Sequence, residues 1–317
     1  MNIVCVEPLG ISEALFESLK AEFASQGHAF TYFMDRREDA DTLVERMRDA
    51  HIVAVSNIPL SAAVLSQCPD LRYLSVAFTG LDHIDLDYCR AHGIEVQNAA
   101  GYSTVAVSEL AVGLMLDLLR RITPLDGATR AGQGRGMFLG RELHGKTVGV
   151  VGTGAIGTAT IRLLRAFGCK VLAYNRTCHP EIEALGATYT DIDTLLSESD
   201  IVTLHVPLTP ETRYLISRER LALMKSTALL VNTARGNVVD IPALAEALAE
   251  GRLAGAATDV YEQEPPLPAD HPLLAAPNCV CLPHVGFATR EAFDIRADIV
   301  FDHVRQYLAG DKLKTKN

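Results

Sequence analysis

Residues 146–177 read KTVGVVGTGAIGTATIRLLRAFGCKVLAYNRT and decide the fold of this chain. The apolar run Thr147–Val151 is typical of a buried parallel strand. It leads into the turn Gly152–Gly157, and apolar residues then recur at helical spacing until Gly168, which is placed to end a helix. A second apolar run, Lys170–Tyr174, follows. A strand, a glycine turn, a helix and a strand within about 30 residues form the context that a dinucleotide-binding fingerprint requires.

Each glycine of the turn has a separate physical role. Gly152 permits the tight bend, Gly154 lets the backbone approach a pyrophosphate, and Gly157 lets the helix pack closely on the strand. The free N–H groups and the positive dipole end of the helix then face the phosphates. Because glycine turns are also common in ordinary loops, the flanking strands and helix are what predict a dinucleotide site here.

The end of the second strand predicts which dinucleotide is bound. NAD-binding units usually place an acidic residue there to bond the ribose 2′-hydroxyl, whereas this chain has Asn175, Arg176 and Thr177. A guanidinium suits a 2′-phosphate through its charge and forked donors. The sequence therefore favours NADP(H). An NAD(H) enzyme with a solvated surface arginine stays open as the alternative.

Composition indicates an ordinary globular protein of two domains or one large one. The chain has 317 residues, of which 48% are hydrophobic and 21% charged, and its net charge is −10. That charge, without a basic stripe, argues against a nucleic-acid partner. The N-terminus is too short and unflanked for a signal peptide, and no apolar run reaches membrane length. Residues 311–317 carry three lysines and are expected to form a solvated end.

The seven cysteines are scattered, and no pair has metal-ligand spacing. They are expected to be reduced thiols of a cytoplasmic protein. Cys279 and Cys281 lie in an apolar run and are expected to point to opposite faces of a strand.

Two series of strands alternate with helices, which predicts an α/β protein with two Rossmann-like or flavodoxin-like parallel sheets. The first series has strands at Ile3–Val6, Ala29–Phe33, Ile52–Val55, Tyr73–Ala77 and Ile94–Gln97. The second has strands at Thr147–Val151, Lys170–Tyr174, Ile201–His205, Ala228–Asn232, Gly255–Asp259 and Val280–Leu282. Only the second series carries a glycine fingerprint after its first strand.

The segments between and after the two series suggest the domain order. Thr104–Arg121 is an unusually apolar helix, as expected where a helix passes between domains. Residues 122–145 carry little core pattern and are expected to form a loop, either around a second subunit or simply exposed. Thr289–Leu308 is a long amphipathic helix that returns to the first domain. The dinucleotide-binding domain, 101–289, is thus inserted into a substrate domain made of 1–100 and 290–317.

Three ionisable residues follow strands of the second series, where parallel sheets hold ligands. Arg235 follows VNTA, Glu264 follows DVYEQ, and His284 follows VCLP. Arginine can grip a carboxylate and polarise a neighbouring ketone, and an imidazolium held by a carboxylate can protonate the oxygen as hydride reaches carbon. Taken singly, they could be a turn residue, a loop charge and a helix cap.

At these residues the chain resembles the D-isomer-specific 2-hydroxyacid dehydrogenase family, which includes glyoxylate/hydroxypyruvate reductases and D-3-phosphoglycerate dehydrogenase. The resemblance covers nearly the whole chain, in ordered motifs. They are GLDHIDLD (80–87), STVAVSELAV (103–112), VGTGAIG (151–157), LHVPLTPETRYLI (204–216), LLVNTARGNVVD (229–240), AATDVYEQEPP (256–266) and LPHVGFAT (282–289).

The resemblance implies a role for each matching residue. Arg235 binds and polarises the substrate, His284 is the acid/base, and Glu264 pairs with it. Phe78, Thr79 and Gly80 match the loop that receives the substrate. The cofactor-contacting positions are Thr104, Gly152, Gly154, Ala155, Ile156, Gly157, Asn175, Arg176, His205, Pro207, Thr212, Thr233, Ala234, Asp259 and Gly286; no metal is expected. A homodimer is expected from the resemblance alone.

Two departures from the family pattern carry information. Asn175 and Arg176 replace the usual acidic residue, which favours NADP. Phe78 stands where many members have glycine, so its ring either narrows the pocket for a small substrate or turns into the core. Glu264 resembles the hydroxyacid enzymes, because formate dehydrogenases carry glutamine there.

The sequence thus predicts an NADPH-preferring reductase of a small 2-oxo acid, glyoxylate or hydroxypyruvate, giving the D-2-hydroxy acid. The alternatives are an NAD-linked dehydrogenase of another acid, such as phosphoglycerate or a bulkier 2-oxo acid, and a dinucleotide-sensing corepressor that binds partner peptides. A flavodoxin-like binding module without redox chemistry is disfavoured by the glycine turn.

Overall fold

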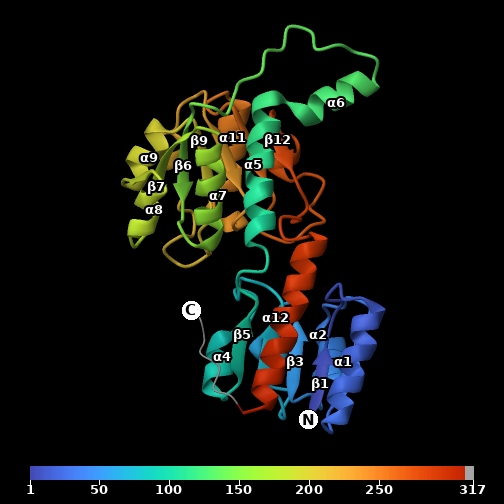
Figure 1. Ribbon diagram of the computed structural model, residues 1–317. Helices are drawn as coiled ribbons and strands as arrows, with labels where there is room; N and C mark the ends of the chain where they lie inside the picture. Colours follow the sequence, from blue (N-terminus) through green and yellow to red (C-terminus); the bar gives the residue numbers. More distant parts are fainter. Residues whose placement is uncertain (311–317) are drawn as a thin grey trace. The chain divides into compact units, whose positions relative to one another are not determined.

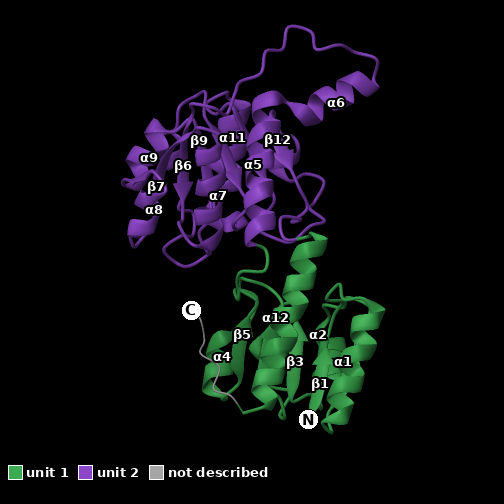
Figure 2. Cartoon of the chain, viewed as in Figure 1, with its two compact units in different colours: residues 1–103, 288–317 green, residues 104–287 purple. Residues whose placement is uncertain are grey.

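The structure is a computed structural model and describes residues 1–310. The chain divides into two compact units (Figure 2). Unit 1 comprises Met1–Ser103 and the stretch from Ala288 onwards, and unit 2 comprises Thr104–Phe287. The lysine-containing end, 311–317, lies outside the described residues. Within the described part, no helix is long and apolar enough to cross a bilayer.

Unit 1 is a five-stranded parallel sheet in the order β2-β1-β3-β4-β5 (Figure 1). Its strands are β1 (Asn2–Cys5), β2 (Ala29–Tyr32), β3 (Ile52–Val55), β4 (Tyr73–Val76) and β5 (Glu95–Asn98). Its helices are α1 (Glu13–Ser25), α2 (Ala40–Met47), α3 (Ala62–Leu65), α4 (Leu86–Ala91) and α12 (Arg290–Leu308). Every residue of β3 and β4 is buried, as expected for central parallel strands covered on both faces.

Helix α12 belongs to unit 1 because it packs on β4. Tyr73 stacks on Tyr307 with ring centroids 4.4 Å apart, and the hydroxyl of Ser75 donates to the carbonyl of Val300. Helix α12 therefore packs on the sheet of unit 1, although the two lie far apart in the sequence.

Unit 2 is a seven-stranded parallel sheet in the order β12-β11-β10-β9-β6-β7-β8. Its strands are β6 (Thr147–Val151), β7 (Lys170–Tyr174), β8 (Ala187–Tyr189), β9 (Ile201–Leu204), β10 (Leu229–Asn232), β11 (Gly255–Thr258) and β12 (Cys279–Cys281). Its α-helices are α5 (Thr104–Arg120), α6 (Ile122–Arg130), α7 (Ala155–Ala166), α8 (Pro180–Ala184), α9 (Ile192–Glu198), α10 (Arg218–Leu221) and α11 (Ile241–Ala249), and two 3₁₀ turns are η1 (Gly236–Val238) and η2 (Pro272–Leu274).

Unit 2 contains elements that the sequence did not predict. Residues 122–130 form helix α6 rather than loop; the helix buries no residue and contains Pro124 and Gly127, which are poor helix formers. Strand β8 was not predicted, because three residues at the sheet edge are too few for a periodic pattern.

The prediction for Cys279 and Cys281 was wrong. Their sulfur atoms lie 3.7 Å apart, on one face of β12. Residues two apart in a strand share a face, and it is the intervening Val280 that points the other way. All seven cysteines lie in the described residues and are free thiols.

Candidate active site

Two glycines in the turn between β6 and α7 leave no room for a side chain. Gly152 has φ of +97°, and a Cβ there would lie 2.5 Å from the carbonyl oxygen of His205. A Cβ on Gly157 would lie 1.9 Å from the carbonyl oxygen of Gly152. No larger side chain fits either position, so helix and strand can approach this closely only with glycine.

Gly154 differs, because a Cβ there would meet nothing within 4 Å. It is the N-cap of α7, and no side chain of residues 1–310 is seen to cap the first N–H groups of that helix. An open cradle of backbone donors at the N-terminus of a helix fits a pyrophosphate. Ala155 and Ile156 are the first two residues of that helix.

The end of β7 carries the residues expected to select the dinucleotide. The Asn175 amide donates to the carbonyl of Thr177 at 2.8 Å, which closes the turn, while Arg176 is exposed. Glu211 lies near that guanidinium: a hydrogen bond from Thr209 is the main cause that lowers the pKa of Glu211, and the charge of Arg176 contributes. The Glu211 carboxylate would therefore repel any anion bound at Arg176.

His205 lies under the glycine turn. Its Nε2 is 3.0 Å from the hydroxyl of Thr203, and its Nδ1 is buried without a hydrogen-bond partner in the described residues. Burial lowers the pKa of His205 to about 4, so the ring is neutral at pH 7. Further along this loop the Thr212 hydroxyl donates to the carbonyl of Pro207 at 2.6 Å.

Asp259 locks the loop after β12 to the end of β11. Its carboxylate accepts the backbone N–H of Val285 at 2.8 Å and that of Gly286 at 2.7 Å. A Cβ on Gly286 would lie 2.9 Å from the same carboxylate, so glycine is required for this contact. Burial raises the pKa of Asp259, and the two N–H donors oppose that shift.

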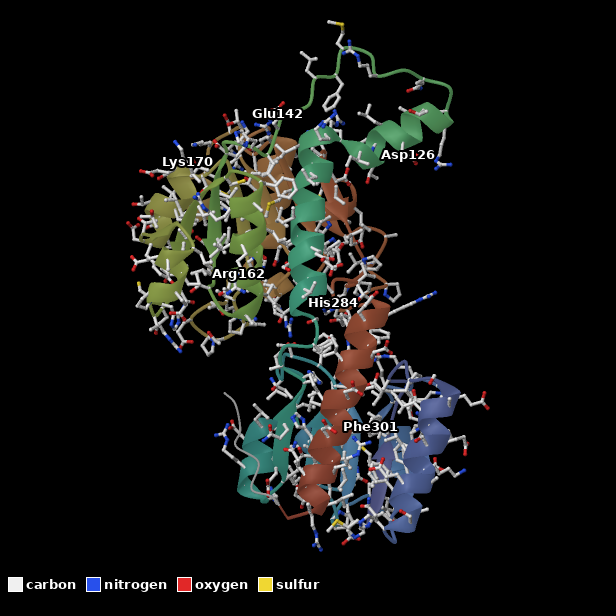
Figure 3. The ribbon with its side chains drawn as sticks, viewed as in Figure 1. Asp126, Glu142, Arg162, Lys170, His284 and Phe301 are labelled. Atoms are coloured by element: carbon white, nitrogen blue, oxygen red, sulfur yellow. The ribbon has the colours of Figure 1, made fainter. Side chains whose placement is uncertain are left out.

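His284 and Glu264 form the pair predicted from the sequence. Both carboxylate oxygens of Glu264 lie 2.8 Å from Nδ1 of His284 (Figure 3 labels the histidine). The imidazole side chain is 12% exposed and the carboxylate 56%. His284 has φ of +57°, which turns it away from the extended path of β12. Because Nδ1 faces the carboxylate, any proton exchange between this ring and a ligand would have to use Nε2.

Arg235 lies between β10 and η1. The Asn232 side chain holds its loop by donating to the Arg235 carbonyl at 2.9 Å and accepting the N–H of Ala234 at 3.0 Å. A Cβ on Gly236 would lie 2.0 Å from the backbone of Tyr261, so this loop packs tightly on the one after β11. The hydroxyl of Thr233 is buried without a hydrogen-bond partner among the described residues, which leaves it available to a ligand.

Strand order brings the three ionisable residues to one end of the sheet of unit 2. Because β10, β11 and β12 are adjacent and parallel, the loops that carry Arg235, Glu264 and His284 follow the carboxyl ends of neighbouring strands. Glu264 and His284 are in direct contact.

The predicted substrate loop lies in unit 1, after β4. The Asn98 amide donates to the carbonyl of Thr79 at 2.6 Å and so supports the loop that continues to Gly80. Phe78 is buried, with its ring edge-on to His83, which favours the core alternative for that side chain. Thr104 belongs to unit 2, as the first residue of α5.

Sequence reasoning missed several supporting residues. Asn98 and Asn232 hold the loops of Thr79 and Arg235, and the Tyr189 hydroxyl lies 2.8 Å from that of Thr153 in the glycine turn. Asn232 stands within the conspicuous stretch VNTARG, so it could have been found. Tyr189 lies on the unpredicted β8 and gave no local signal.

An uncapped helix N-terminus, a histidine–carboxylate pair and an arginine at the same end of a parallel sheet are typical of a dinucleotide-dependent oxidoreductase. Residues 112–286 match the family model described as D-isomer specific 2-hydroxyacid dehydrogenase, NAD binding domain. The chain is 43% identical over 279 residues to glyoxylate reductase of Thermofilum pendens, covering 86% of this chain and 82% of that protein. The chain therefore belongs to this family, and is an enzyme that acts on the CH–OH group of a 2-hydroxy acid with a nicotinamide dinucleotide.

Other relatives differ in substrate and cofactor. D-3-phosphoglycerate dehydrogenase of Methanocaldococcus jannaschii is 39% identical, over 86% of this chain and 52% of that protein. Among solved structures, an acyclic imino acid reductase in complex with NADPH has a TM-score of 0.89 and 27% identity, covering 99% of both chains. D-lactate dehydrogenase of Aquifex aeolicus with NAD has a TM-score of 0.85 and 30% identity, covering 98% of this chain and 96% of that one.

Proposed function

We propose that this enzyme is an NADPH-preferring reductase of small 2-oxo acids, with glyoxylate or hydroxypyruvate as substrate and the D-2-hydroxy acid as product. The observation that carries the proposal is the pairing of His284 Nδ1 with both oxygens of Glu264 at 2.8 Å. It gives the chain an acid/base whose Nδ1 is held by a carboxylate. The name of the Thermofilum pendens relative supports glyoxylate.

The chain's own groups divide the work of reduction. The reduced nicotinamide, when bound, supplies the hydride. Arg235 binds the substrate carboxylate and polarises the adjacent carbonyl through its forked donors. His284, protonated and held through Nδ1 by Glu264, gives the Nε2 proton to the carbonyl oxygen as charge develops there. In the oxidative direction the neutral Nε2 takes that proton back.

Replacing Arg235 tests the substrate assignment. Arg235→Ala should raise KM and lower kcat on glyoxylate, with kcat/KM falling about 100-fold or more because a charge-assisted bidentate contact is lost. Initial rates with NADPH measure the effect. Arg252, a partly exposed arginine of unit 2 paired with Glu250 and Glu246, offers the matched control Arg252→Ala, which should leave the rates unchanged. Near-normal turnover of Arg235→Ala would refute the assignment.

Arg176 supports NADPH over NADH. It is exposed at the end of β7, where a 2′-phosphate would lie, and Asn175 supplies no carboxylate to repel it. Arg176→Ala should weaken NADPH binding about tenfold to 100-fold and leave NADH nearly unchanged. Arg218→Ala, which removes an exposed arginine paired with Glu246, is the control. Equal losses for both cofactors would remove the 2′-phosphate role.

Two other functions remain distinguishable from this one. An NAD-linked dehydrogenase of another acid, as in the phosphoglycerate-named relative, would favour NADH and a larger substrate in a panel of 2-oxo acids. A corepressor-like binding protein would oxidise NADPH far below enzyme rates. The family membership and the Glu264–His284 pair favour the enzyme.

We also expect a homodimer in the cytoplasm, which suits the free thiols. Support for a second subunit comes from the segment after α6, where Met137 is 95% and Leu139 is 82% exposed. Figure 1 shows α6 and this segment extending from the body of unit 2. Exposed apolar side chains on an extended segment suit a partner surface. Light scattering should give a dimer, and Leu139→Lys should shift it toward monomer; an unchanged monomeric mass in both would refute the dimer.

A further inference from the structure

Two thiols in unit 2 lie close together outside the residues assigned to catalysis. Cys279 and Cys281 are the ends of β12, which lies at the edge of the sheet and pairs with β11. Their sulfur atoms are 3.7 Å apart, and the Cys281 thiol also lies 3.7 Å from the carbonyl oxygen of Leu273. Both residues are partly exposed, whereas Cys5, Cys68, Cys89 and Cys169 are buried.

Both cysteines line a cavity of about 590 Å³ within unit 2. Its wall also includes Leu118 of α5, Pro124 of α6 and Phe138 of the following segment. The cavity is far larger than a small hydroperoxide. Because the two cysteines line it, a hydroperoxide that enters the cavity can reach their sulfur atoms.

The pair favours a thiolate on Cys281. A hydrogen bond from the Cys279 thiol is the main cause that lowers the pKa of Cys281 to about 7, against the opposing effect of burial. A thiolate at neutral pH is the form that reacts with peroxides.

We propose that Cys279 and Cys281 form a dithiol site that a hydroperoxide oxidises to an intrachain disulfide and that a dithiol reductant restores. The Cys281 thiolate attacks the outer oxygen of the peroxide, the O–O bond breaks, and the alkoxide that leaves takes from solvent the proton that the Cys281 thiol released on ionisation. The Cys279 sulfur then attacks the Cys281 sulfenic acid, the S–S bond forms, and hydroxide leaves with the Cys279 proton as water. The two sulfur atoms lose two electrons and the peroxide gains two.

The strand geometry permits the disulfide and makes it easy to reduce. At about 3.3 Å per residue, the Cα atoms of positions two apart in a strand are roughly 6.6 Å apart. This is near the upper end of the range that a disulfide spans, about 4.4–6.8 Å. Closing the bond therefore draws the two ends of β12 together, and bonds formed under such constraint are the labile, regulatory ones.

Shortening β12 would act on the proposed acid/base. The strand continues directly into Leu282, whose N–H donates to the Thr258 carbonyl at 2.9 Å and whose carbonyl accepts the Tyr261 hydroxyl at 2.9 Å. His284 follows two residues later. Drawing Cys281 toward Cys279 pulls on these bonds and displaces His284, so oxidation should lower turnover. This consequence rests on the proposed role of His284, whereas the disulfide itself does not.

Mass spectrometry after alkylation tests the chemistry on the full-length protein. Hydrogen peroxide should produce a peptide lighter by two hydrogens that joins Cys279 to Cys281, with both thiols blocked to iodoacetamide until dithiothreitol is added. Cys281→Ser should prevent the reaction, and Cys279→Ser should stop it at a sulfenic acid trapped by dimedone. Cys178→Ser, which removes the exposed lone cysteine, should change nothing. Two thiols that stay alkylatable, or a link between chains, would overturn the proposal.

Turnover tests the link to His284 separately. The oxidised protein should reduce glyoxylate about tenfold more slowly or worse, since small displacements of a catalytic group are costly, and dithiothreitol should restore the rate. Cys279→Ser should lose this disulfide-dependent, dithiothreitol-reversible slowing. A disulfide that forms without a change in rate would overturn the link, while a reduced protein without activity would count against the proposed function instead.

Discussion

In both units the first strand leads into a helix, but the N-terminus of that helix is capped by a side chain in unit 1 and uncapped in unit 2. In unit 1, β1 is followed by the buried carboxylate of Glu7, which accepts the N–H of Ser56 at 2.7 Å, and α1 is capped by the Ser12 hydroxyl, which accepts from Leu15. In unit 2, α7 begins at Gly154, which has open space around it and no side chain to cap the helix. One helix N-terminus is satisfied by its own chain, and the other is left for an anion.

This contrast teaches that topology alone does not make a dinucleotide site. Both sheets are parallel and both first crossovers are helices, yet only the turn of unit 2 leaves space and donors together. In unit 1 a Cβ on Gly10 would lie 2.5 Å from the ring of Phe293, so a side chain of unit 1 itself occupies the space beside this turn.

Giving the unit 2 helix a cap of its own should have the largest effect. Gly154 has φ of −68°, which any residue adopts, so Gly154→Asp should fold with stability equal to or up to about 1 kcal/mol above the parent. Its carboxylate would occupy the N–H groups and repel the pyrophosphate, and NADPH affinity should fall about 100-fold or more, roughly 3 kcal/mol. Calorimetric titration and urea unfolding measure both quantities.

The reciprocal change in unit 1 is the control. Ser12→Ala should cost about 1 kcal/mol of stability through the lost cap of α1 and leave NADPH affinity unchanged. If Gly154→Asp bound NADPH within threefold of the parent, the open N-terminus would not be the phosphate site.

Lowering the pH should reduce the free energy of unfolding through His205 in unit 2 and increase it through Glu7 in unit 1. The folded pKa of His205 is about 4, against 6.5 for an unperturbed histidine, so the unfolded state takes up the proton first as pH falls from 6.5 to 4. Stability present above pH 6.5 is lost in that window, by up to about 2 kcal/mol at pH 5. Burial raises the pKa of Glu7, so that carboxyl contributes stability at low pH that is lost as pH rises through its folded value.

Urea unfolding at pH 7 and pH 5 measures the difference. His205→Gln should flatten the acid loss, because an amide does not titrate, and Glu7→Gln should leave it in place. An acid loss that persists in His205→Gln would assign it to other groups.

The smallest effect should come from Glu211, which faces the proposed 2′-phosphate site. Glu211→Gln removes a negative charge near Arg176 and should tighten NADPH binding about twofold to fivefold, since exposed charges interact weakly. NADH affinity should stay the same. Titrations at low and high salt would show whether the gain is electrostatic, because it should shrink with salt. Tighter NADH binding by the same factor would point to a change in the loop instead.

Local signals in the sequence predicted most of the elements. The apolar runs of β6 and β7, the stop at Gly168 and the Asp240 cap of α11 all depend on residues a few positions apart. Helix α6 was not predicted because it contains Pro124 and Gly127, and β8 was not predicted because it is a short edge strand. The spacing of Cys279 and Cys281 was sufficient to predict that they share a face, because residues two apart in a strand point the same way.

The sequence by itself determined the glycine turn, the residue types at the strand ends and, through its ordered motifs, the family. Only the tertiary structure decided that β10, β11 and β12 are neighbours, that Glu264 reaches Nδ1 of His284, and that the N-terminus of α7 stays open. The reason is physical: turns and periodicity arise from neighbouring residues, whereas strand order is set by pairing between segments far apart in the chain.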